Sequence, residues 1–148
     1  MAKLKSPVQS NKIRQKTESN EKCFSDQYPW FSFKDLTTNS KYNLKSLSGK
    51  DAETTLRGMY QKLQELSSHT WLYWMGMPKS AGLETMNYQD IRFTVDANLA
   101  KDTTLYIIRF DTYQGANKGR IIGYKNTPCS VFHIIGFDIG FSAYNHGS

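Results

Sequence analysis

Three short apolar runs, separated by polar turns, occupy the last third of this 148-residue chain. Residues 105–110, 120–124 and 131–137 are rich in β-branched and aromatic side chains, which favour strands. The segments between them contain turn-forming residues at 114–117 and 126–128. Because consecutive strands joined by short turns pair antiparallel, the sequence predicts a three-stranded antiparallel meander.

The middle of the chain predicts two helices. Residues 50–66 place apolar side chains three and four positions apart, which is the spacing of a helix with one apolar side. This apolar side consists of Leu56, Met59, Tyr60, Leu63 and Leu66. Residues 71–75 predict a second, short helix with Thr70 as its N-cap and Gly76 at its end.

Further strands are predicted at residues 30–36, 42–44 and 91–95, and residues 78–90 are predicted to be a polar connection. Strands and helices that are grouped in this way indicate an α+β fold. The sequence therefore predicts an antiparallel sheet of four to five strands, with the long and the short helix packed on one face.

Charge divides the chain into two parts. Residues 1–22 are polar and carry +4 of the formal net charge of +6, so we expect a flexible, disordered basic arm. A single domain is expected over residues 23–148. No apolar stretch has the length of a signal-peptide core or a membrane span, which predicts a cytoplasmic protein without a membrane partner.

The sequence contains no motif for a metal or a cofactor, and none is expected. Cys23 and Cys129 are the two cysteines; in a reducing compartment they are free thiols, and a disulfide between them stays open. Asp111 and Asp138 follow strands, but two carboxylates without a third ligand are weak evidence for a cation site.

Strand alternation assigns the polar residues of the meander to faces of the sheet. It places Arg109 with Leu105 and Ile107, Arg120 with Tyr124, and His133 with Ile135 and Phe137, and it places Lys125 on the opposite face from Arg120. In a purely structural interpretation, Arg109 pairs with Asp111 or Asp138, Arg120 is exposed at the start of its strand, and His133 is a semi-buried core residue.

The order of these elements resembles that of the RelE/ParE toxin superfamily. The sequences I-I-R-F, G-R-I-I-G-Y and V-F-H-I-I-G-F-D within residues 107–138 are also similar to small proteins of prophages and mobile elements. The resemblance implies a metal-independent RNA endonuclease or RNA-binding toxin, acting on RNA or the ribosome and controlled by an antitoxin. By position, it implies site residues at Arg109, Arg120, Lys125 and Tyr144.

Cleavage of RNA by its own 2′-hydroxyl needs a base, an acid and positive charge beside the phosphate. An imidazole exchanges a proton near neutral pH, and a tyrosine can stack on a base or position a phosphate. The predicted catalytic residues are Arg109, Arg120, His133, Tyr144 and His146. The predicted nucleic-acid-binding residues are Lys118, Tyr124 and Lys125.

A second hypothesis is a non-enzymatic binding protein of a phage or mobile element that inhibits a host defence or replication factor. It depends on a surface cluster of aromatic residues beside the basic arm, because aromatic side chains often carry interface energy. The members of this cluster are Trp30, Phe31, Trp71 and Trp74. If these residues lie in the core instead, the hypothesis loses its main support.

Overall fold

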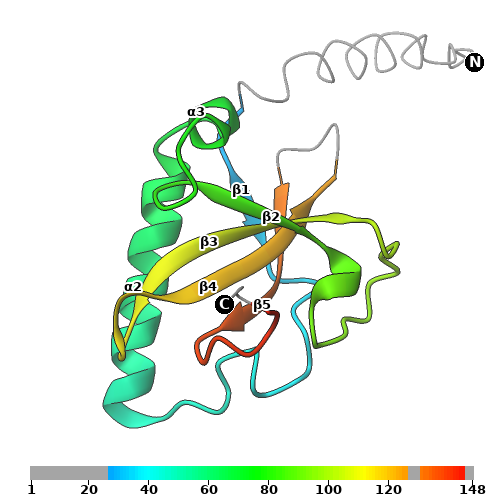
Figure 1. Ribbon diagram of the computed structural model, residues 1–148. Coiled ribbons are helices and arrows are strands. Elements are labelled where there is room, and N and C mark those ends of the chain that lie inside the picture. The colour runs from blue at the N-terminus through cyan, green and yellow to red at the C-terminus, as the bar shows by residue number, and fades with distance from the viewer. Residues whose placement is uncertain (1–26, 127–130, 146–148) are drawn as a thin grey trace, which may run out of the picture.

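The three apolar runs form the centre of a five-stranded sheet in the computed structural model, which describes residues 27–126 and 131–145 (Figure 1). The strand order is β1-β5-β4-β3-β2. The elements are β1 (Trp30–Ser32), α2 (Gly49–Ser67), α3 (Trp71–Met75), β2 (Leu83–Asn87), the 3-10 turn η2 (Tyr88–Asp90), β3 (Thr104–Thr112), β4 (Gly115–Lys125) and β5 (Val131–Asp138). This arrangement confirms an α+β fold. The predicted basic arm, both cysteines and His146 lie outside the described residues.

The predicted meander of β3, β4 and β5 is confirmed, and both pairings are antiparallel. The first hairpin is tighter than the sequence indicates, because Thr112 already pairs with Gly115. A carboxylate oxygen of Asp111 accepts a hydrogen bond from the Asn117 N–H at 2.8 Å, where Asn117 adopts a positive φ of 57°. As a result β4 begins five residues before Arg120, which lies inside the strand rather than at its start.

The sheet is mixed, so the prediction of a purely antiparallel sheet is wrong. β1 has only three residues and runs parallel to β5, with Trp30 opposite Val131 and Ser32 opposite His133. The second edge strand is β2, within a segment predicted to be a polar connection. Its half-buried, polar-rich sequence has one β-branched residue, Thr85, and no aromatic one, so few of its residue types mark a strand.

Residues 42–44 and 91–95 are not strands, although both were predicted to be. Leu44 has a φ of +69°, which turns the chain away after the Tyr42 carbonyl accepts one hydrogen bond from Phe137. The Arg92 N–H donates to the Ala143 carbonyl at 2.7 Å. The Thr94 carbonyl accepts from the Thr37 hydroxyl at 2.7 Å, so residues 91–95 bond to other irregular segments instead of joining the sheet.

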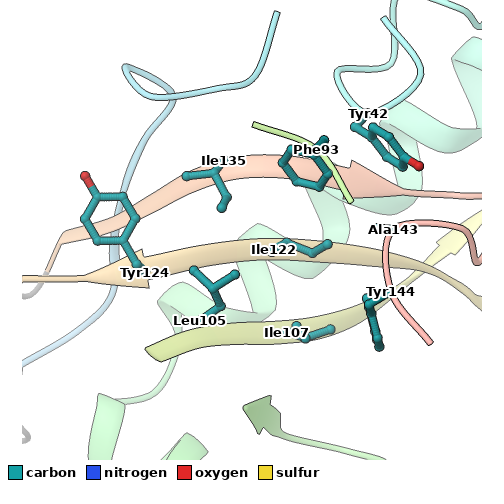
Figure 2. Packing of buried hydrophobic residues seen from close by; sticks show 9 residues of the cluster. All are labelled: Tyr42, Phe93, Leu105, Ile107, Ile122, Tyr124, Ile135, Ala143 and Tyr144. Carbon is teal, nitrogen blue, oxygen red and sulfur yellow. The ribbon is translucent and has the colours of Figure 1, made fainter. Parts of the chain in front are cut away.

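Each side of the sheet carries its own core. On the helix side, Leu66, Trp71 and Trp74 pack on the apolar side chains of β3, β4 and β5, so both helices cover the same face as predicted. On the opposite side, called the loop side here, irregular segments supply Tyr42, Phe93, Ala143 and Tyr144 (Figure 2). The three layers are helices, sheet and loops, and neither face of the sheet is bare.

Helix α2 matches the predicted bounds to within a residue at each end, but its buried side is rotated from the predicted one. Leu66 is buried, and Met59 and Leu63 pack on the core, whereas Leu56 and Tyr60 are exposed. Instead, α2 packs on the sheet through Thr55 and Gly58. A Cβ at Gly58 would lie 1.9 Å from the Asp111 carbonyl oxygen, so the small residue permits the close approach of helix and strand.

A bulge in β5 changes the predicted alternation. Ile122 pairs with Gly136 and Gly123 pairs with Ile134, so Ile135 has no opposite residue on β4. Ile135 then lies in the loop-side core, and Phe137 turns to the helix-side core beside Ile134. The prediction that Phe137 shares a face with His133 and Ile135 is therefore wrong, because two residues oppose one at a bulge.

Candidate functional site

Four charged side chains cross the loop side of the sheet in a row. Arg109 on β3 lies opposite Arg120 on β4, and Arg120 lies opposite Asp138 on β5. Glu84 on β2 bonds to Arg109 at the other end. We call Glu84, Arg109, Arg120 and Asp138 the arginine row. Like charges directly opposite each other on neighbouring strands repel, so the two arginines are held between two carboxylates.

Arg109 is the accessible arginine of the row. Its Nε donates to Glu84 Oε1 at 3.0 Å, and a second guanidinium nitrogen bonds the same oxygen. The side chain keeps 34% of its surface exposed. The predicted pairing with Asp111 or Asp138 is wrong, because β2 brings Glu84 alongside and Asp111 bonds Asn117 instead.

Arg120 is buried, with 6% of its surface exposed, which contradicts its predicted exposure. Its Nη1 donates to the carbonyl oxygens of Asn117 at 2.9 Å and Gly119 at 3.1 Å. The guanidinium carbon lies 4.8 Å from the centre of the Phe141 ring. Its Nε is buried and has no hydrogen-bond partner among the described residues. The guanidinium is thus fixed in a desolvated position beneath residues 139–145, which we call the C-terminal segment.

Asp138 ties this C-terminal segment to the row. The carboxylate is fully buried, and its oxygens accept hydrogen bonds from the Ser142 N–H at 3.0 Å and the Ala143 N–H at 3.2 Å. The next residue, Tyr144, lies close enough to the row for the row's charges to shift the pKa of its hydroxyl. Burial raises the pKa of Tyr144 above its usual range; the charge of Glu84 raises it further, whereas the charge of Arg120 lowers it.

The structure therefore brings together three of the predicted catalytic residues: Arg109, Arg120 and Tyr144. A hollow of about 290 Å³ adjoins Tyr144 and is lined by Met86, Asp90, Arg92, Tyr144 and Asn145. Arg92 donates to the Ser142 carbonyl at 3.4 Å and also bonds the Asn145 side chain. The hollow thus reaches Tyr144, the neighbour of the row, and is lined by none of the four row residues themselves.

His133 belongs to a different cluster. Its ring stacks on Tyr124, with 4.8 Å between the ring centres, and its Nδ1 lies 3.7 Å from Asp35 Oδ2. The Tyr124 hydroxyl donates to the same carboxylate oxygen at 2.6 Å. Tyr124 and Arg120 are four residues apart on one strand, about 13 Å at the rise of a β-strand. Proton transfer needs hydrogen-bond contact, so His133 does not act at the arginine row.

The Tyr124–Asp35 bond predicts a change of stability in alkaline solution. Burial, the hydrogen bond to Asp35 and the negative charge of Asp35 together raise the pKa of Tyr124 to about 12. The folded state thus holds this proton more tightly than the unfolded state, so its stabilising contribution is complete below pH 10 and is lost as the pH rises towards 12. We expect the urea midpoint to fall more steeply above pH 10 for the native chain than for Tyr124→Phe. Parallel curves would contradict this assignment.

The predicted nucleic-acid-binding residues do not form one surface. Lys125 lies on the helix side, with its Nζ 4.4 Å from the ring centre of Trp71 and 4.5 Å from that of Tyr106. Burial lowers the pKa of Lys125 to about 8. Lys118 is exposed on the β3–β4 hairpin, and Tyr124 is buried at the Asp35 cluster.

The predicted surface cluster of aromatic residues is not formed. Trp71 and Trp74 are buried in the helix-side core, and Phe31 packs edge-on against Phe132. Trp30 alone of the four is strongly exposed, at 69%.

No protein-family model, no curated protein and no solved structure matches the chain. Within residues 27–126 and 131–145, no three His, Cys, Asp or Glu side chains lie close enough to share a metal ion. No helix in the same part of the chain is both long and apolar enough to cross a membrane. Among the described residues, the arginine row is therefore the feature that most directly indicates a function.

Proposed function

We propose that this protein is a RelE-like toxin of a mobile element that binds and cleaves RNA without a metal ion, at the arginine row. The observation that carries the proposal is the cross-strand pair of Arg109 and Arg120 next to Tyr144. Glu84 and Asp138 flank the two guanidinium groups, and the remaining N–H groups of Arg109 can form charge-assisted hydrogen bonds to a further anion. A phosphodiester supplies such an anion.

Each member of the row has a role in this reaction. Arg109 uses two guanidinium nitrogens on Glu84, which leaves further N–H groups of the planar fork for a phosphate oxygen. The buried guanidinium of Arg120 supports the developing negative charge from within the sheet, where its field is weakly screened. Arg120 and Asp138 thereby position the site, and Arg109 contacts the substrate.

Glu84 and Tyr144 supply the proton transfers. The Glu84 carboxylate removes the proton from the 2′-hydroxyl, whose oxygen then forms a bond to the adjacent phosphorus. The bond from phosphorus to the 5′-oxygen breaks, and the Tyr144 hydroxyl gives a proton to that leaving oxygen. The Tyr144 hydroxyl is protonated at neutral pH, and its proton moves as negative charge develops on the leaving oxygen. The products are a 2′,3′-cyclic phosphate and a 5′-hydroxyl.

Expression in a bacterial host tests this function. From a tightly repressed promoter, we expect rapid growth arrest together with cleavage of transcripts. Glu84→Gln should relieve the arrest, because the amide cannot accept the proton. Normal growth with intact RNA would contradict the proposal.

A further inference from the structure

β2 (Leu83–Asn87), drawn in green in Figure 1, forms one edge of the sheet and lacks the features that normally protect an edge. It pairs with β3 through five consecutive residue pairs without a bulge. It contains no proline and no lysine, and its one charged residue, Glu84, bonds Arg109. Natural sheets protect exposed edges with such residues, bulges or very short strands, and an edge without them is a template for another strand.

The opposite edge differs. β1 has only three residues and follows Pro29, so it offers little backbone for pairing. At β2, Thr85 and Asn87 are exposed, and a hollow of about 400 Å³ runs beside the strand. No further strand of the described residues pairs with this edge.

The two ends of the β2 edge carry opposite charges. Lys79 precedes the strand and Asp90 follows it, and both are exposed. Neither forms an ion pair with another described residue. Arg92 lines the same hollow as Asp90 but bonds Ser142 and Asn145. The exposed Lys79 and Asp90 of one copy are therefore complementary to Asp90 and Lys79 of a second copy that runs antiparallel.

We propose that two copies of this chain associate through β2, antiparallel about a two-fold axis near Thr85, to form one continuous sheet. In this arrangement Lys79 of each copy lies towards Asp90 of the other, and Leu83 lies opposite Asn87 of the other. Such an interface is isologous and closes after two copies. The self-complementary charges favour a second copy over an unrelated strand, which would need a matching charge at each end. This association is independent of RNA cleavage.

Sedimentation equilibrium on the full chain tests the association. We expect a dimer for the native sequence and a monomer for Thr85→Lys, which places two lysines opposite each other at the axis. Circular dichroism should show an unchanged fold, since Thr85 is exposed. A monomeric native chain, or a Thr85→Lys variant that still dimerises like the native chain, would overturn the proposal.

Exchanging the charges of Lys79 and Asp90 tests the proposed register of the two β2 strands in the dimer. Lys79→Glu should weaken the dimer about tenfold, because both symmetric pairs become repulsive. Adding Asp90→Lys should restore the native dissociation constant. Lys50→Glu, at an exposed lysine in the first turn of α2, is the matched control and should leave the dimer unchanged. Failure of the double variant to recover would rule out the proposed pairing of Lys79 with Asp90.

Discussion

Arg109→Ala should lower the rate of RNA cleavage at least about a hundredfold, because it removes the accessible guanidinium from the phosphate. The loss of one donor that stabilises developing charge has this order of effect in other enzymes. The fold should be retained, since the side chain is one-third exposed. The measurement is the initial rate on a single-stranded RNA, with circular dichroism as a check on folding.

Two further variants make this result specific. Arg57→Ala removes an arginine that also pairs with a glutamate, Glu53, but lies exposed on α2, and it should cleave at the native rate. Arg109→Lys keeps the charge and loses the planar fork, so its rate should lie between those of the native chain and Arg109→Ala. If Arg109→Ala cleaves as fast as Arg57→Ala, the arginine row is not the active site.

Asp138→Ala should give the largest loss of stability, about 3–5 kcal/mol in the free energy of unfolding. The buried carboxylate lies opposite Arg120 and accepts two backbone N–H groups of the C-terminal segment. Its removal leaves a buried guanidinium without its neighbouring negative charge. The midpoint and slope of urea unfolding measure the effect.

Asp102→Ala is the matched control, because Asp102 is exposed in a turn, and it should change stability by less than about 0.5 kcal/mol. A loss below about 1 kcal/mol in Asp138→Ala would show that Arg120 does not depend on this carboxylate. Arg120 would then be stabilised mainly by the carbonyl oxygens of Asn117 and Gly119.

Patterns of neighbouring residues in the sequence predicted those helices and strands whose structure depends mainly on nearby residues. The spacing of apolar residues predicted α2 nearly to its bounds, and Thr70 caps α3 by accepting a hydrogen bond from the Tyr73 N–H. The three runs of the meander also follow from alternation and turns. In these segments the neighbours that decide the structure lie a few residues away.

Elements decided by distant contacts could not be predicted. β2 is a strand because β3 pairs with it, and residues 91–95 are irregular because their backbone bonds the C-terminal segment. The bulge at Ile135 also has no local signal, since its carbonyl is bonded by the N–H of Thr37, almost a hundred residues away. Single-residue shifts of this kind reverse the face on which later side chains lie.

For the candidate site, alternation correctly grouped Arg109 with Leu105 and Ile107, and it placed Lys125 on the opposite face from Arg120. It could not indicate that Arg120 is buried or that Glu84 is the partner of Arg109. Glu84 lay in a predicted connection, and Asp35, the partner of Tyr124, lay in a predicted strand. Both carboxylates gain their roles from pairings between distant segments.

The most direct test of the central claim is the chemistry of the RNA ends. Purified native protein is incubated with a defined single-stranded RNA in the presence of a strong chelator, and the termini of the products are identified by mass spectrometry. We predict fragments that end in a 2′,3′-cyclic phosphate and begin with a 5′-hydroxyl, formed at the same rate without the chelator. Intact RNA, or cleavage that disappears on chelation, would contradict metal-independent cleavage at the arginine row.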